Sequence, residues 1–359
     1  MNNALSAFLE DHGPVLALDI GSGTQDALLA LPGTLPENWP RFVLPAPALR
    51  TAARVRALSA ARRPLWLCGS VMGGGFASSI REHLAQGLPV AAAPEAAASL
   101  HDDPGRVRAL GVNITDARPE GFAPVFLADY EPGFWSAFLA AADLPQPALI
   151  TAAAQDHGVH AGLGNREGRF HLWRELLLRS GGDPALWLYA EPPAPCTRLA
   201  ALSRAIGGGP VADTGAAAVL GALSVPEVAE RSDREGVLVV NAGNSHTVAF
   251  LVFQRRILGV YEHHTGLVST PGLLRDLDEF RRGWLPDEQV RAAGGHGCVM
   301  LELPAEAEGF RPAFILGPRR DILAGHGVFI APHGDMMPAG CHGLLHGLAL
   351  RRAGEAGQP

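Results

Sequence analysis

Lysine is absent from this chain of 359 residues, although basic residues are not. All 29 are arginine, set against 36 acidic residues and a formal net charge of −7. Without lysine the chain cannot form a Walker A phosphate loop, whose lysine reaches the β- and γ-phosphates. It also cannot form a Schiff base with pyridoxal phosphate or use a lysine amine as a nucleophile.

Cysteine is scarce and scattered. No CxxC pair is present, which argues against a zinc ribbon or a redox dithiol, and the CxxxCxxC cluster motif of radical enzymes is missing as well. We therefore expect reduced thiols and a cytoplasmic location. The four cysteines are Cys68, Cys196, Cys298 and Cys341.

Long apolar runs and basic runs are also missing. The N-terminal segment MNNALSAFLEDHG is polar and does not resemble a signal peptide. The apolar stretch from Val15 to Leu31 is interrupted by Asp19 and Asp26, so we do not expect it to cross a membrane. Because the chain is mildly acidic and has no basic run, nucleic acid is not expected as its main partner.

The remaining composition indicates a folded enzyme-sized protein. Hydrophobic residues make up 47% of the chain and charged residues 18%, which allows a substantial core. Short apolar runs alternate with helical stretches, for example at Leu65–Cys68 and Phe76–Gln86. This alternation predicts an α/β fold, and the length is typical of two domains.

A glycine-containing hairpin is predicted near the N-terminus and again in the second half. Val15–Ile20 is an apolar β-run, followed by the turn residues GSGT and a second apolar run. Gly236–Asn241 is a comparable run, followed by AGNSH and the strand Thr247–Phe253. The two segments, DIGSGTQDALLAL and NAGNSHTVAFLV, indicate an internal repeat. The glycine break at Gly207–Gly209 predicts a boundary between domains 1–208 and 209–359.

These hairpins resemble the mark of the ASKHA superfamily, which contains actin, heat-shock chaperones and sugar kinases. Within it the chain is most similar to carbohydrate kinases, in which a PV…GD..AA…G segment precedes the second hairpin; Pro210-Val211, Asp213, Ala216–Ala218 and Gly221 fit this pattern. More narrowly, it resembles a family often labelled pyruvate formate-lyase activating enzyme. That resemblance rests on DIGSGTQD, MGGG, QDHG, DTGAAAVLGAL, NAGNSHT, EHHTG, GGHG and APHGDMM. The labelled activity requires a cysteine cluster that this sequence lacks.

The resemblance implies two ribonuclease H-like, actin-like ATPase domains with a cleft between them, and ATP and Mg²⁺ as cofactors. Glycine turns allow backbone N–H groups to surround phosphate oxygens without a lysine. Asp19 would hold Mg²⁺ through water. Asp213 has two readings, general base or helix N-cap. The candidate nucleotide-binding residues are Gly21, Ser22, Gly23, Thr24, Gly243, Asn244, Ser245, Thr247, Gly317, Arg319 and Arg320.

Two features depart from the kinase pattern. Asn241 stands in the second hairpin where most relatives have aspartate. The region expected to hold adenosine, which starts at Gly317, is short before the next predicted strand at Val328. Small residues in the helix after Asp213 and in the last helix predict a close crossing of these two helices at the hinge.

Histidine is abundant, with 14 residues. Neutral imidazoles bind metals and also serve as acids or bases, while single histidines are commonly structural. The candidates for either role are Glu262-His263-His264, His296, His333 with Asp335, and His157 with Asp156. The candidate metal ligands are His263, His264, His333 and Asp335. The candidate substrate contacts are Gln155, Asp156, His157, His263 and His264.

Three functions fit these features. The first is an ATP- and Mg²⁺-dependent phosphotransferase of the sugar-kinase type, acting on a small hydroxylated substrate in the interdomain cleft. The second is an ASKHA ATPase or nucleotide sensor that drives a protein partner. The third is a metal-dependent enzyme that uses cleft histidines. A small-molecule substrate is expected, without nucleic acid or membrane; a homodimer or a protein partner is left open.

Overall fold

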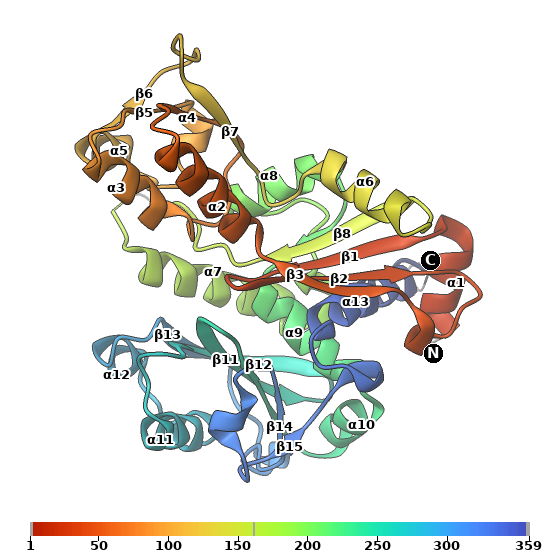
Figure 1. The fold of residues 1–359 in the computed structure, drawn as a ribbon. Helices are drawn as coiled ribbons and strands as arrows, with labels where there is room; N and C mark the ends of the chain where they lie inside the picture. Colours follow the sequence, from red (N-terminus) through yellow and green to blue (C-terminus); the bar gives the residue numbers. More distant parts are fainter. Residues whose placement is uncertain (1–2, 161, 357–359) are drawn as a thin grey trace.

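Three β-sheets organise the computed structural model, which describes residues 3–160 and 162–356 (Figure 1). The first sheet has the strand order β3-β2-β1-β8-β9. Its strands are β1 (Val15–Ile20), β2 (Thr24–Ala30), β3 (Arg41–Pro45), β8 (Leu149–Ala154) and β9 (Val211–Ala212). The second sheet has the order β13-β12-β11-β10-β14-β15. Its strands are β10 (Val237–Ala242), β11 (His246–Phe253), β12 (Arg256–His264), β13 (Gly297–Met300), β14 (Ala313–Leu316) and β15 (Val328–Phe329).

The two sheets share a five-stranded topology, to which the second sheet adds β13, antiparallel to β12. In the first, β1, β2 and β3 form an antiparallel meander, and β8 and β9 add to β1 in parallel. In the second, β10, β11 and β12 form the same meander, and β14 and β15 add to β10 in parallel. The repeat predicted from the glycine hairpins therefore corresponds to a repeat of sheet topology.

The third sheet is inserted between β3 and β8. It has the order β6-β5-β4-β7, and all of its pairs are parallel. Its strands are β4 (Leu65–Gly69), β5 (Val90–Ala92), β6 (Val112–Ile114) and β7 (Ala123–Leu127). The α/β alternation predicted for this stretch is present, but the strands pair with one another and have their own core instead of joining β1.

Helices form layers around and between the sheets. The helices are α1 (Asn3–His12), α2 (Pro47–Ala60), α3 (Ala77–Ala85), α4 (Pro94–Ala97), α5 (Pro104–Ala109), α6 (Pro132–Ala141), α7 (Asn165–Ser180), α8 (Thr197–Ala205), α9 (Thr214–Leu223), α10 (Pro226–Arg234), α11 (Thr270–Arg281), α12 (Asp287–Ala292) and α13 (Ala339–Ala356). In Figure 1, α9 and α13 lie between the two repeated sheets, and α2–α5 surround the inserted one. Among the described helices, none has both the length and the apolar character needed to cross a bilayer.

Strand alternation decides what each face of β1 touches. Leu16, Leu18 and Ile20 share a core with α6 and α8. Val15 and Ala17 point the other way, into a core that includes residues of α9, α13 and β10. Because side chains alternate along a strand, Asp19 lies on the same face as Val15 and Ala17 and is directed toward α13.

Helices α9 and α13 cross at glycines, as their small residues predicted. A Cβ added at Gly343 would collide with the Ala217 carbonyl oxygen, and one added at Gly221 would collide with that of Ala339. Both collisions are with backbone, which cannot turn aside as a side chain can. The crossing therefore requires glycine on both helices.

Gly343→Ala is expected to lower the free energy of unfolding by about 3 kcal/mol, because the two helices must move apart. Urea unfolding would measure this. Gly354 on the same helix has open space around its Cβ position, so Gly354→Ala serves as the matched control. The control should gain about 0.5–1 kcal/mol from helix propensity. Equal stability of the two variants would contradict the close crossing.

Candidate functional site

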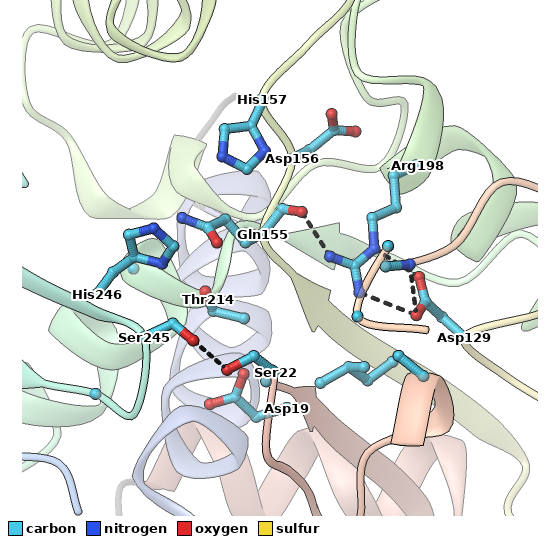
Figure 2. Close-up of a pocket in the computed structure, with 18 of the residues that line it drawn as sticks. Asp19, Ser22, Asp129, Gln155, Asp156, His157, Arg198, Thr214, Ser245 and His246 are labelled. Atoms are coloured by element: carbon cyan, nitrogen blue, oxygen red, sulfur yellow. Dashed lines mark hydrogen bonds and ion pairs between the residues drawn. The ribbon is translucent and has the colours of Figure 1, made fainter. Parts of the chain in front are cut away.

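A cavity of about 470 Å³ lies where the two repeated sheets and the inserted sheet meet. This is within the size range of small-molecule sites. The ends of β1 and β10, the turn after β4, the segment after β8 and the first turns of α9 and α13 form its wall (Figure 2). The sequence-predicted residues that line it are Asp19, Gly21, Ser22, Thr24, Gln155, Asp156, His157, Gly243, Asn244, Ser245 and Gly317.

The two hairpin tips meet at this cavity. The Ser22 and Ser245 hydroxyl oxygens lie 2.6 Å apart, and Figure 2 shows the pair above Asp19. Each turn is closed by the same bond: the Gly21 amide donates to the Thr24 carbonyl at 2.9 Å, and the Gly243 amide donates to the His246 carbonyl at 3.0 Å. The tips therefore face each other, while Gly23 lies against the side chain of Asn244.

The hydrogen bonds that close the two turns show which residues of the two hairpins are equivalent, and this alignment differs by one residue from that of the sequence patterns. Thr24 and Thr247 are both predicted nucleotide-binding residues, but the structural counterpart of Thr24 in the second hairpin is His246. One step along a strand reverses the side-chain direction, so His246 lines the cavity while Thr247 is buried on the other face. There the Thr247 hydroxyl lies 3.0 Å from the hydroxyl of Thr265. The threonine of the second hairpin is structural.

Asp19 lies at the floor of the cavity, and no cationic side chain among the described residues pairs with it. Its carboxylate packs directly against Gly340 at the start of α13, where a Cβ would overlap it. Asp19 Oδ1 is buried and has no hydrogen-bond partner among the described residues. Burial, followed by the charges of Asp26 and Asp213, raises the pKa of Asp19 well above its usual range. A cation bound here would offset that cost.

Asp213 is the N-cap of α9. Its Oδ1 accepts from the Gly215 amide at 2.9 Å and its Oδ2 from the Asp156 amide at 3.3 Å. Arg169 also donates to both oxygens, at 2.8 and 3.0 Å. Burial raises the pKa of Asp213, but the ion pair and hydrogen bonds with Arg169 outweigh burial, and the pKa is lowered. The structure confirms that Asp213 caps α9. Both of its carboxylate oxygens accept hydrogen bonds, so neither is free to act as a general base in this geometry.

Arg169 links the two repeated halves through a buried network. From α7 it pairs with Asp213 and donates from Nε to Glu262 of β12 at 2.6 Å. Glu262 also accepts from Gln155 at 2.8 Å and from Trp173 at 3.3 Å. Arg169 is 3% exposed and Glu262 is 0% exposed at the side chain, so this single guanidinium neutralises two buried carboxylates. Sequence reasoning missed Arg169 and offered Glu262 only as a candidate metal ligand or acid/base group, because no local pattern links the two residues.

A second arginine, which is partly buried, shapes the side of the cavity next to the inserted sheet. Arg198 of α8 pairs with both oxygens of Asp129, at 2.7 and 2.9 Å, and donates to the Gln155 carbonyl at 2.8 Å (Figure 2). A Cβ at Gly73 would lie 2.8 Å from Arg198 Nη2, so glycine there lets the MGGG turn pack closely against this guanidinium. The MGGG segment is thus a wall of the cavity.

Histidines gather on one side of the cavity. His157 and His246 line it, and the ring centre of His296 lies 5.5 Å from that of His157. Burial, followed by the charge of Arg169, lowers the pKa of His157 to about 3. Burial also lowers the pKa of His246 to about 4. These imidazoles are neutral at neutral pH.

The predicted metal-ligand set is not brought together. His264 faces the histidine cluster, but its neighbour His263 points to the opposite face of β12, where its Nδ1 lies 3.1 Å from the His264 carbonyl. His333 lies 3.6 Å from Glu37, and Asp335 pairs with Arg41 at 3.5 Å. The set of His263, His264, His333 and Asp335 is therefore corrected: strand alternation and the fold separate its members.

The region expected to hold adenosine contributes only its first two residues, Gly317 and Pro318, to the cavity wall. Gly317 lines the cavity with a φ of +99°, and a Cβ there would collide with the carbonyl oxygen of Ala242. Arg319 and Arg320 are not among the lining residues; Arg320 stacks over Phe329, 5.4 Å from the ring centre. The short 3₁₀ helix Arg320–Leu323 takes the place of a long helix before β15.

Comparison with known proteins gives a family and several distant folds. Residues 72–322 match the family described as “Putative pyruvate format-lyase activating enzyme (DUF1786)”. No curated protein matches the chain.

Among solved structures, the chain is similar at 10% identity to a ROK family glucokinase from Streptomyces griseus in complex with glucose and AMPPNP; the TM-score is 0.31, over 95% of this chain and 100% of the other. A protein from Listeria monocytogenes described as a “putative N-acetylmannosamine kinase” matches at 10% identity with a TM-score of 0.32, over 95% and 99%. A ROK family transcriptional regulator, a homologue of the E. coli MLC protein, matches at 10% identity with a TM-score of 0.30, over 96% and 81%. TM-scores this low carry no conclusion about this chain.

Proposed function

The chain belongs to the family described as “Putative pyruvate format-lyase activating enzyme (DUF1786)”, and on that premise we propose that it is an ATP- and Mg²⁺-dependent phosphotransferase of the sugar-kinase type. Its substrate is a small hydroxylated molecule bound in the cavity. The observation that carries this proposal is the meeting of the two hairpin tips above the unpaired carboxylate of Asp19.

The proposal includes two ribonuclease H-like domains, 1–208 and 209–359, with the inserted sheet as an addition to the first. The shared strand order of the two main sheets supports it. The hinge in this arrangement is the crossing of α9 and α13. Because Ser22 and Ser245 touch, the tips separate slightly when phosphate enters between them.

The residues fit a magnesium nucleotide in charge and in hydrogen bonding. Backbone N–H groups of Ser22-Gly23 and Asn244-Ser245 hold the phosphates, and Thr24 adds a hydroxyl. Asp19 holds Mg²⁺ through water, which compensates the buried carboxylate. When bound, Mg²⁺ neutralises phosphate charge, and transfer then depends mainly on positioning. The adenine lies near Gly317, where the segment that leads to β15 forms only a short wall of the cavity.

The substrate side of the cavity is formed by Gln155, Asp156 and His157 with the Arg198–Asp129 pair. These groups orient hydroxyls by donating and accepting hydrogen bonds. Asp213 is kept as the candidate base because it begins α9 beside the lining residue Gly215. It would accept a proton only after Arg169 shifts away, since Arg169 occupies both of its oxygens.

The activating-enzyme activity in the family's description is not part of this proposal. Cys196, Cys298 and Cys341 are buried, and they lie in three different hydrophobic clusters. Cys68 stands on β4 of the inserted sheet. The described cysteines are therefore too dispersed to bind one cluster.

ATP with Mg²⁺ is expected to raise the melting temperature of the full chain. Binding at 100 times Kd adds about 2.7 kcal/mol to the free energy of unfolding, which a thermal-shift assay detects. ATP with EDTA is the control and should give a much smaller shift. ADP formation should then depend on an added polyol or sugar. ADP formation without substrate would favour an ATPase or nucleotide sensor instead, and no shift at millimolar ATP with Mg²⁺ would refute both.

A further inference from the structure

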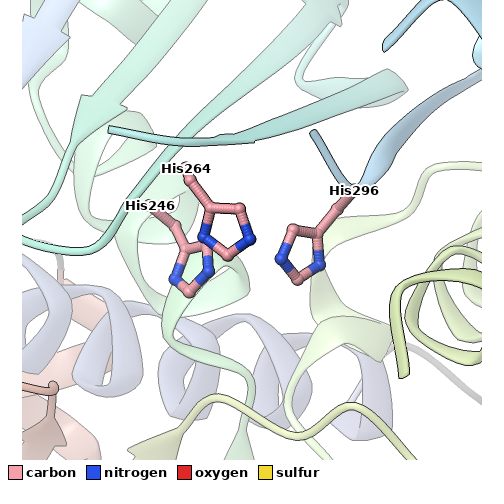
Figure 3. A group of neighbouring side chains, drawn as sticks. All are labelled: His246, His264 and His296. Carbon is pink, nitrogen blue, oxygen red and sulfur yellow. The ribbon is translucent and has the colours of Figure 1, made fainter. Parts of the chain in front are cut away.

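Three histidines from distant segments converge next to the cavity. His246, His264 and His296 each present a ring nitrogen within 4.8 Å of those of the other two (Figure 3). Their ring centres form a nearly equilateral triangle with sides of 4.6, 4.7 and 4.8 Å. Three imidazoles on one tetrahedral zinc ion, with Zn–N bonds of about 2.0–2.1 Å, have ring centres about 5 Å apart.

The fold fixes this triangle. His246 and His264 are direct register partners on β11 and β12, so their side chains leave the same face of the sheet. His296 is held opposite by its backbone amide, which donates to the Glu262 carbonyl at 2.9 Å. Gly297 follows with a φ of +143°, a conformation that L side chains rarely adopt. The motifs NAGNSHT, EHHTG and GGHG thus contribute one histidine each.

The nitrogens of this cluster lack other partners. The buried His246 Nε2 and both ring nitrogens of His296 have no hydrogen-bond partner among the described residues, and His296 is 1% exposed. Buried polar atoms normally have a partner, and leaving one unpaired costs about 1–3 kcal/mol. A neutral imidazole has one lone-pair nitrogen and one N–H. These unpaired nitrogens are therefore a reason to expect a ligand that accepts one lone pair from each ring.

We propose that His246, His264 and His296 form a site for a divalent transition metal, with zinc the best fit. Three neutral imidazoles are a ligand set that zinc takes in sites that keep a fourth position open. Glu262 supplies an outer partner, because its Oε1 lies 3.8 Å from His296 Nδ1. A small movement would let Nδ1–H donate to this carboxylate and leave Nε2 for the metal.

The open fourth position faces the substrate side of the cavity. His246 lines the cavity, and His157, which also lines it, stands beside His296. A water or a substrate oxygen can therefore complete the coordination. The site is distinct from the magnesium position at Asp19, which is a carboxylate on a different strand. It does not depend on nucleotide binding, so it can be tested separately.

The test is zinc binding by the full chain after removal of metal with EDTA and dialysis. Titration against a chromogenic zinc chelator should show one equivalent bound. His246→Ala and His296→Ala should each weaken binding by roughly 100-fold or more, because each removes one of three protein ligands. Cobalt substitution should give a visible absorption spectrum typical of tetrahedral coordination, which these variants lose.

His333→Ala is the matched control, because His333 is a partly buried histidine outside the cluster, and its zinc affinity should equal that of the parent chain. Thermal melting of each variant shows whether it is folded, so that loss of binding is not loss of structure. Zinc binding below about a tenth of an equivalent by the folded parent chain would overturn the proposal. So would unchanged affinity in a folded variant that lacks both His246 and His296.

Discussion

Arg169→Ala is expected to lower the free energy of unfolding by about 3–5 kcal/mol, because it leaves buried carboxylates without a counter-charge. Asp213 and Glu262 both depend on this guanidinium, and Arg169 also donates to the Asp156 carbonyl at 2.9 Å. These bonds join the two repeated halves of the molecule. Chemical denaturation would measure the loss, and the melting temperature should fall with it.

Arg204→Ala is the control for removal of an arginine. Arg204 pairs with Glu95 at the surface, where its side chain is 65% exposed, and such pairs contribute about 0–1 kcal/mol. Arg169→Lys separates charge from geometry, since its ammonium keeps the positive charge but does not span the four acceptor atoms that the planar guanidinium reaches. It should lie between the alanine variant and the parent chain. A loss no larger for Arg169→Ala than for Arg204→Ala would contradict the network.

Asp19→Asn is expected to have opposite effects on activity and on stability. Removal of the carboxylate proposed to hold Mg²⁺ should reduce ATP-dependent turnover by about 10³-fold, equivalent to several kcal/mol of transition-state stabilisation. The thermal shift with ATP and Mg²⁺ should shrink as well. Kinetic assay of ADP formation and thermal shift measure these two effects.

Stability should instead rise in Asp19→Asn. Burial raises the folded-state pKa of Asp19, so the folded protein holds this proton more tightly than the unfolded chain does. The contribution of Asp19 to stability is therefore fully present below the ordinary carboxyl range and is lost as the pH rises through the raised pKa. The variant's advantage should thus be larger at pH 8 than at pH 5, measured without divalent cations. Asp116→Asn, at an exposed position, should show neither effect.

Much of the fold could be predicted from local sequence. The strands β1 and β10 and the helix after Asp213 were predictable because apolar runs, turn glycines and an N-cap aspartate act on neighbouring residues. Even the repeat was visible, since both halves use the same hairpin. The inserted sheet was not, because an isolated strand such as β4 does not show which strand it will pair with.

Some residues of the candidate site were likewise predictable from local sequence, and others were not. Asp19 and the hairpin tips follow from the turns that contain them, and they line the cavity. The sequence pattern predicts Thr247 as the cavity-facing residue, whereas His246 faces the cavity in the structure. A one-residue shift in the start of a strand reverses which side chains face the cavity. His263, His264 and His333 are equivalent candidates in the sequence. The register of β12 against β11 separates His264 from His263, and the fold places His333 elsewhere, beside Glu37.

By itself, then, the sequence determined the α/β class, the repeated hairpins and the exclusion of all lysine chemistry, because these depend on composition and on neighbours along the chain. The tertiary structure decided which buried charges arginine neutralises, which face of each strand reaches the cavity, and which three histidines meet. These are contacts between residues far apart in sequence, and they are set by strand pairing and helix packing. No lysine is available, and the two arginines that line the cavity, the buried Arg169 and the partly buried Arg198, each form several hydrogen bonds through a planar guanidinium to their carboxylate partners.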